Sequence, residues 1–152
     1  MQFITEVLDT TKVTELLEEA TGKKSMFIEG VFLQDTVQNR NGRSYPKQVM
    51  KSSVRTYIES YVNTNRAMGE LNHPPSPQVN PERAAIKVES LKENGSDWIG
   101  KAKVLNTPMG SILRNLTEDG VQMGVSSRGL GSVKESNGVS IVQEGFHITA
   151  ID

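Results

Sequence analysis

The sequence predicts an α+β fold: an antiparallel, barrel-like sheet flanked by two or three helices. Residues 84–93 and 97–105 alternate apolar and polar positions on either side of the turn-forming string NGS, which is typical of a β-hairpin. Two other segments carry apolar residues at helical spacing after a proline, and the chain from residue 121 onwards is rich in strand-forming residues. With 152 residues, the chain suits one domain that buries a sizeable core.

The two segments that follow a proline are predicted helices. Residues 46–63 place a proline in the first turn, where its missing N–H costs no hydrogen bond, and their apolar positions mark one face: Val49, Met50, Val54, Tyr57, Ile58, Tyr61 and Val62. Residues 107–120 begin with Thr107 as the N-cap, continue with Pro108, and have Gly120 near the end. Both segments are therefore expected to cover the sheet.

A third helix is predicted over residues 11–21, with Gly22 as its stop, because apolar residues recur there at helical spacing: Val13, Leu16, Leu17 and Ala20. The next segment, residues 26–34, is rich in strand formers, and Gly30 indicates a bulge within it. The polar string at 35–46 is a predicted loop. So are residues 72–81, whose four prolines forbid a helix interior and a central strand.

Composition excludes several classes of function. The net charge is −1 and lysines and arginines are scattered, so no basic face is expected for nucleic acid. No apolar run approaches the ~20 residues of a transmembrane helix. The chain has no cysteine and no phosphate-binding glycine-lysine motif, and no cofactor is expected. Glu70 and His73 are three residues apart, but the prolines exclude the helix on which that spacing would bind a metal.

Two short strings place catalytic residue types among small or rigid neighbours. In GELNHPP, two prolines stiffen the backbone after His73, and in GVSSRG, glycines flank Ser126 and Ser127. A serine hydroxyl needs a base to remove its proton, and histidine is the usual base near neutral pH. Strand alternation turns the two serines to opposite faces, so at most one is a nucleophile. Taken singly, each string also fits an ordinary loop: a surface histidine, or a glycine-serine turn.

The last strand, GFHITAID, offers two candidates for a group that orients the histidine, His147 and Asp152. They lie five positions apart and leave opposite faces of a regular strand. Asp152 shares a face with Phe146, Ile148 and Ala150, and a carboxylate that ends an apolar row needs a partner, which favours Asp152. The alternative is a strand-end aspartate exposed to water.

Together these strings resemble the prohead core proteases of T-even-type tailed bacteriophages. Further segments match in the same order and at similar intervals: FIEGVFLQ, VQNRNGRSYP, NPERAAIKVE and IVQEGF. The resemblance covers roughly residues 26–152, and it is specific because several unusual strings match at once.

The resemblance implies a serine endopeptidase whose core is similar to that of the herpesvirus assemblins. Such enzymes lie inside the prohead, in the bacterial cytoplasm, where they digest scaffold, trim capsid proteins and cleave themselves. By motif, His73 becomes the general base, Ser126 the nucleophile and, across a one-residue gap, Asp152 the acidic third member. Herpesvirus enzymes use a histidine third, so His147 is the alternative. Arg128 and Gly129 match the segment after the nucleophile, which implies support of the oxyanion.

Related proteases cut after glutamate with an aliphatic residue two positions earlier. The family resemblance therefore implies a basic partner for that glutamate, and the candidates are Arg40, Arg43 and Arg128. The strings ITEV and LLEEA fit the rule, so self-cleavage after Glu6 or Glu19 is a hypothesis. It would divide the chain into a removable helical segment, residues 1–25, and a protease domain, residues 26–152.

Members of the family continue past the position of Asp152, so the natural protein is expected to extend further and this chain to be a zymogen or a truncated, inactive form. Two other interpretations remain open. One is a non-catalytic structural relative, similar to tail-tube or scaffold components; the other is a non-viral hydrolase with the same dyad. Only the protease interpretations require His73 and Ser126 to meet. The oligomeric state is open, with a homo-oligomer among the alternatives.

Overall fold

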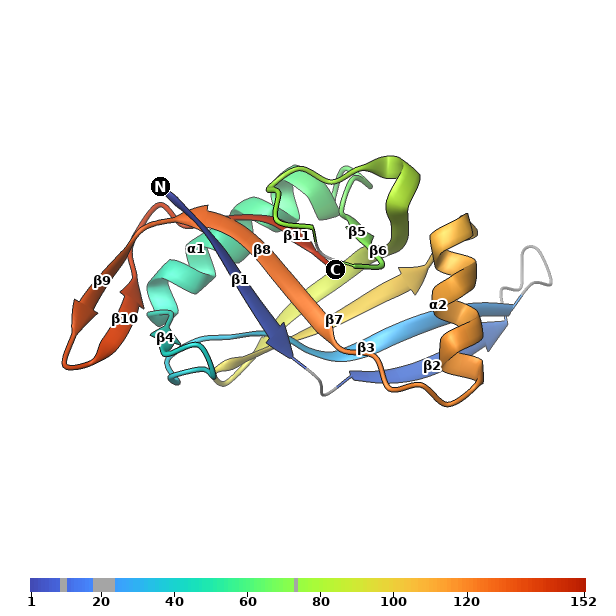
Figure 1. Ribbon diagram of the computed structural model, residues 1–152, viewed down its shortest axis with the longest axis horizontal. Helices are drawn as coiled ribbons and strands as arrows, with labels where there is room; N and C mark the ends of the chain where they lie inside the picture. The colour runs from blue at the N-terminus through green and yellow to red at the C-terminus, as the bar shows by residue number, and fades with distance from the viewer. Residues whose placement is uncertain (9–10, 18–23, 73) are drawn as a thin grey trace.

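The computed structural model describes residues 1–8, 11–17, 24–72 and 74–152. These residues form three β-sheets and two α-helices (Figure 1). The largest sheet has the strand order β2 (Thr11–Leu17), β3 (Lys24–Gln34), β7 (Asp97–Val104), β6 (Ala84–Asn94) and β5 (Met68–Glu70), with every neighbouring pair antiparallel. The hairpin predicted around NGS is confirmed as β6 and β7, and Gly95 has the positive φ that its turn needs.

The second sheet has the order β1 (Gln2–Leu8), β8 (Val125–Gly131) and β11 (His147–Ile151), all antiparallel. Figure 1 shows β1 lying along β8 across one side of the molecule. The third sheet is small and consists of β4 (Arg43–Ser44), β10 (Val139–Val142) and β9 (Val133–Ser136). β9 and β10 join at a turn where Asn137 and Gly138 both have positive φ, as the string SNG predicts.

The barrel predicted from the strand-rich sequence is wrong in one respect, because the described strands form open sheets and none of these sheets closes. The strands are nonetheless mostly antiparallel, as expected, with one short parallel pairing between β4 and β10. Closure depends on which distant strands pair, and alternation along a strand carries no information about its partner. An α+β fold with two α-helices is confirmed.

The helix predicted over residues 11–21 is also wrong where the structure describes it. Residues 11–17 form strand β2, which pairs antiparallel with β3 from Thr11 opposite Gly30 to Leu17 opposite Lys24. Residues 18–21 and Gly22 lie outside the described residues. The segment contains three β-branched residues, and pairing with an adjacent strong strand outweighs a weak helical preference.

Strand 26–34 is confirmed within β3, but its bulge lies two residues beyond the predicted position. Gly30 pairs regularly with Gly100, and the register shifts between Val31 and Leu33. The ring of Phe32 lies against Gly100, where a Cβ atom would come within 2.0 Å of it. The room for this ring explains the glycine at 100, and the bulge accompanies the ring that is packed there.

Both proline-started helices are confirmed. α1 (Lys47–Tyr57) follows Pro46 and continues into a wider π turn, η1 (Ile58–Val62), so the helical face spans the predicted segment. α2 (Pro108–Glu118) has Thr107 as its N-cap, whose hydroxyl accepts the Gly110 N–H at 3.0 Å. Within the described chain, no helix is both long and apolar enough to cross a membrane.

The core lies between the sheets and α1, which places β11 firmly against the helix. The Ser53 hydroxyl of α1 donates to the Phe146 carbonyl at 2.7 Å, just before β11 begins. On the other side of β11, a Cβ atom at Gly69 in β5 would lie 2.1 Å from the Ile151 carbonyl oxygen. β11 is thus held between α1 and β5 at close approach, and so is the residue that follows it, Asp152.

Asp35 is a buried polar anchor at the end of β3. Its carboxylate accepts the Trp98 indole N–H at 2.9 Å and the Thr36 hydroxyl at 2.7 Å, and the Lys47 ammonium lies 3.3 Å away. Burial alone would raise the pKa of Asp35, but these hydrogen bonds and the ammonium outweigh it and lower that pKa. A group with a lowered folded-state pKa stabilises the protein above its unfolded pKa and loses that contribution in acid.

Replacing Asp35 with asparagine is therefore expected to cost about 1–3 kcal/mol of unfolding free energy at pH 7. The difference from wild type should shrink as the pH falls below about 4, where the unfolded aspartate takes up its proton. Urea unfolding at several pH values measures both effects. Glu89→Gln removes the same charge from an exposed position of β6 and should have little effect. A pH-independent loss would contradict the assignment.

Candidate active site

The two serines of GVSSRG lie side by side in β8, the central strand of its sheet. Ser126 is 7% exposed and Ser127 is 3% exposed. β8 is regular along its pairing with β1, so the two side chains leave opposite faces, as alternation predicts. Ser127 lines a cavity on the inner side, whereas Ser126 shares the other face with Arg128, two residues further on. The strand therefore distinguishes the two hydroxyls by what each one faces.

Arg128 is fully buried and forms the centre of a polar cluster on the Ser126 face. Its Nε donates to Asp152 Oδ2 at 2.7 Å, and its Nη2 donates to Asp152 Oδ1 at 2.9 Å and to Glu70 Oε2 at 2.8 Å. Its Nη1 donates to the carbonyls of Ser76 at 2.7 Å and Gln78 at 3.0 Å. A guanidinium has five N–H donors, and all five are used within the chain.

The cluster balances its charges at the edge of the buried region. Arg128 and Asp152 form a bidentate pair, and the second carboxylate, Glu70, has Arg83 Nε 3.4 Å from its Oε1. Burial disfavours the charged guanidinium, but the two carboxylates outweigh it and hold the pKa of Arg128 above its usual value. Removing one partner of such a buried pair leaves an uncompensated charge, which typically costs about 3–5 kcal/mol.

Asp152 lies where the ends of three strands meet. Its backbone N–H donates to the Ser126 carbonyl at 2.7 Å, which extends the pairing of β11 with β8 by one residue. Its Oδ1 also accepts the Glu70 backbone N–H at 2.8 Å. A carboxylate offers about four acceptor positions, and these contacts use three of them. One position on Oδ2 is left to accept a further donor, such as an imidazole N–H.

His73 lies outside the described residues, so its distance to Ser126 stays a prediction. The residues on both sides of it are nevertheless fixed to the same cluster. Glu70 precedes it and binds Arg128 and Asp152, while Ser76 and Gln78 follow it and accept from Arg128. The loop predicted at 72–81 is therefore anchored at both ends beside the strand that carries Ser126.

His147, the alternative third member, lies at the other end of the sheet. It pairs with Leu130 of β8, four residues from Ser126, which corresponds to about 13 Å along a strand. Its ring meets that of Tyr61 edge-on, with centroids 6.3 Å apart. The arrangement places Asp152, and not His147, beside the face of Ser126.

The reason given above for preferring Asp152 is wrong, although the residue is well placed. The register of β11 shifts between Ile148 and Ala150, so the last strand does not alternate regularly. Ala150 and Ile151 are neighbours, yet both are fully buried. Asp152 is stabilised by its pair with Arg128, a contact that the apolar row does not indicate.

The oxyanion support expected from Arg128 and Gly129 has a different appearance in the structure. The Arg128 side chain has no N–H left to donate. A Cβ atom at Gly129 would lie 2.5 Å from the Phe146 ring, so internal packing alone requires a glycine there. Sequence reasoning missed the positioning role of Arg128 and the part played by Glu70. A charged residue inside an otherwise small and apolar strand was the available signal, because such a residue needs a buried partner.

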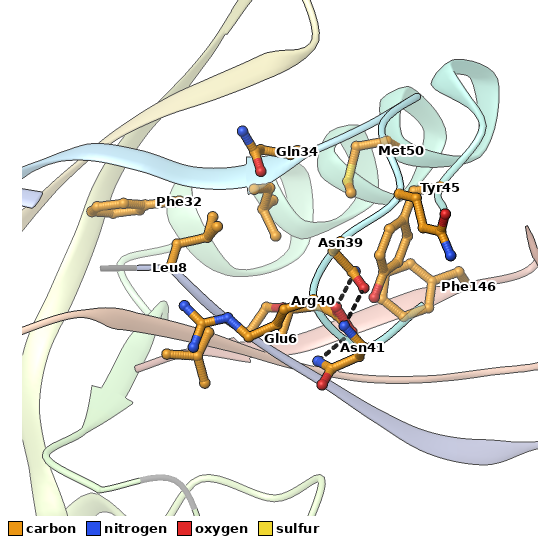
Figure 2. A pocket seen from close by; sticks show the side chains of 14 residues that line it. Glu6, Leu8, Phe32, Gln34, Asn39, Arg40, Asn41, Tyr45, Met50 and Phe146 are labelled. Atoms are coloured by element: carbon orange, nitrogen blue, oxygen red, sulfur yellow. Dashed lines mark hydrogen bonds between the residues drawn. The ribbon is translucent and has the colours of Figure 1, made fainter. Parts of the chain in front are cut away.

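A cavity of about 260 Å³ opens on the Ser127 side, between β1, β3 and the loop at 38–41 (Figure 2). Arg40 lines it from an exposed position, and Arg43 reaches its wall through Glu6. Arg43 Nε donates to Glu6 Oε1 at 2.6 Å. The two arginines predicted to bind substrate are thus gathered at one cavity, and the carboxylate found there belongs to the chain itself. No group of three metal-ligating side chains occurs in the described parts of the chain.

Three comparisons relate the chain to known proteins. Residues 4–152 match the family model described as prohead core protein serine protease. The prohead core protein protease of Enterobacteria phage T4 is 44% identical over 131 residues, which cover 84% of this chain and 61% of that protein. The structure of the bacteriophage T4 capsid assembly protease, gp21, aligns with a TM-score of 0.94 and 38% identity, covering 99% of this chain and 96% of the other. The chain spans about three fifths of the length of the curated relative.

Arg128→Lys is expected to lower the unfolding free energy by about 3 kcal/mol, because an ammonium cannot reproduce the planar five-donor contact. It should also speed amide hydrogen exchange in residues 70–80, which only the guanidinium joins to β8. Chemical denaturation and exchange mass spectrometry measure the two effects. Arg55→Lys, on the exposed side of α1, is the matched control. Unchanged exchange in the loop would show that Arg128 does not anchor it.

Proposed function

The chain belongs to the prohead core protein serine protease family, and we propose that it is the serine endopeptidase of a phage capsid-maturation pathway. Its substrates are the scaffold and capsid proteins of the prohead, cut after glutamate, inside the prohead in the bacterial host cytoplasm. One observation carries the proposal beyond the family match. The Arg128 guanidinium joins the strand of Ser126, the Asp152 carboxylate and the loop that contains His73.

In this mechanism Ser126 attacks the carbonyl carbon of the scissile bond while the imidazole of His73 takes the hydroxyl proton. The imidazolium returns that proton to the leaving amine, and water then hydrolyses the acyl-enzyme by the reverse roles. Asp152 fixes the imidazole tautomer through the acceptor position that Arg128 and the Glu70 N–H leave open. Arg128 is a positioning residue, because it acts through Asp152 and the loop.

The remaining parts of the proposal rest on the family resemblance. A core organised like that of the herpesvirus assemblins is one of them, and processing of the N-terminal 25 residues is another. Self-cleavage would follow Glu6, which lies in β1, or Glu19, which lies outside the described residues. Gly129 and backbone N–H groups beside Ser126 are the remaining candidates for oxyanion support.

Cleavage of a peptide with an Ile-x-Glu site tests the nucleophile. We expect Ser126→Ala to reduce kcat by at least about 10³-fold, because the covalent step is lost, and Ser127→Ala to retain activity since its hydroxyl faces the cavity. Loss with Ser127→Ala alone would reverse the assignment. No cleavage by any form, including a chain extended to the full length of its relatives, would favour a non-catalytic structural relative instead.

Glutamate specificity is tested by comparing glutamate and glutamine peptides. Arg43 is the favoured partner, because it already contacts a carboxylate beside β8. Arg43→Gln should lower kcat/KM for the glutamate peptide by about 10–100-fold and leave the glutamine peptide nearly unchanged, since only the charge-assisted contact is lost. Arg40→Gln serves as the comparison. An equal loss on both peptides would contradict a role in reading the charge.

A further inference from the structure

We propose that β1 occupies, within the same chain, the place of an extended peptide beside β8, and that Arg43, Asn39 and Asn41 form the site that reads a glutamate side chain in that peptide. The inference rests on the proposed function and deepens it. It names the subsite, the kind of ligand that the subsite takes, and the segment of this chain that now fills it.

The first observation is the way β1 pairs. It lies antiparallel to β8 without a break, from Gln2 opposite Gly131 to Leu8 opposite Val125, and it is the outer strand of its sheet. Without β1, the N–H and C=O groups of β8 on that side would be unpaired. An unpaired strand edge is the structure to which an extended peptide adds by main-chain hydrogen bonds.

The second observation is the site around Glu6. Its carboxylate accepts from Arg43 Nε at 2.6 Å, from Asn41 Nδ2 at 3.4 Å and from Asn39 Nδ2 (Figure 2 shows the two asparagines). The Nη2 of Arg43 also donates to the Thr5 carbonyl at 2.6 Å. Arg43 thus contacts both the acidic side chain and the main chain of the preceding residue. Such paired contacts recognise a glutamate in an extended strand.

The third observation concerns how loosely β1 is packed. Ile4 is its one fully buried residue, and the rest of the strand is half-buried or exposed. The cavity of about 260 Å³ lies next to Glu6, whereas a permanent core strand normally packs without such space. In its wall, the buried Tyr45 hydroxyl makes no hydrogen bond of normal geometry to any described residue. The site therefore has room and polar capacity that β1 does not use.

The register relates this site to the serine pair. Glu6 lies opposite Ser127 and Val7 lies opposite Ser126. A second peptide in the same register would place the bond after its glutamate beside these two residues. It could bind only after β1 has left, because one edge of β8 accepts one strand. β1 is therefore a competing occupant of the substrate position.

Peptide binding tests the inference without requiring catalysis. The probe is a fluorescent peptide of residues 2–8, QFITEVL, titrated into the Ser126→Ala chain, which cannot cut it. Adding Glu6→Gln weakens β1 in its own site, so the probe should bind at least tenfold more tightly than to Ser126→Ala alone. A probe with glutamine in place of glutamate should bind at least tenfold more weakly, and Arg43→Gln should abolish that difference.

Gln2→Lys is the matched control, because it changes the net charge by the same amount at the exposed end of β1 and should leave probe affinity unchanged. Equal binding of the two probes, or no gain with Glu6→Gln, would overturn the inference. If Glu6→Gln unfolds the chain, hydrogen exchange in Ser126→Ala gives the second test. Excess probe that replaces β1 must speed exchange of the Thr5 and Val7 amides, and unchanged protection would overturn the proposal. A chain that fails to hydrolyse peptides can still pass this test, so the two proposals fail separately.

Discussion

The contact between the Arg128 guanidinium and its five acceptors is the constraint on which the site depends. It joins β8, the residue after β11, the end of β5 and the loop at 72–81, which come from distant parts of the sequence. Each of these elements is also fixed by its own sheet. The guanidinium therefore adds little to the choice of fold and much to the relative position of Ser126, Asp152 and the residues that flank His73. Its planar, fixed donor geometry is what makes a four-way junction possible.

The same contact shows why a buried ion pair can be retained although it is a poor source of stability. Apolar residues of equal volume would often stabilise a core as well or better. They could not hold a carboxylate at the end of β11 with one acceptor position still open. Glu70 strengthens this arrangement from two directions, through its side chain to Arg128 and through its backbone N–H to Asp152. The cluster thus combines anchoring with the orientation of a group that the proposed chemistry uses.

Local patterns predicted a large part of the fold and the face of each serine, whereas long-range contacts were beyond them. The hairpin at 84–104, the two proline-started helices and the alternation of Ser126 and Ser127 depend on neighbours in sequence. The helix at 11–21 failed because pairing with β3 outweighed a weak periodicity, and the bulge in β11 is invisible to an argument that assumes regular alternation. The role of Arg128 required knowledge of residues 24 to 58 positions away, which one sequence does not supply.

The position of β1 at the edge of β8 has a consequence for when such an enzyme would act. A strand tethered to its own binding site competes at an effective concentration that free peptides match only at about millimolar levels. In dilute solution the tethered strand would win and the groove would stay filled. In a closed shell packed with the proposed substrates, the balance would shift towards exchange. The edge strand would then measure crowding, so that confinement itself, rather than a dedicated activator, would determine the onset of digestion.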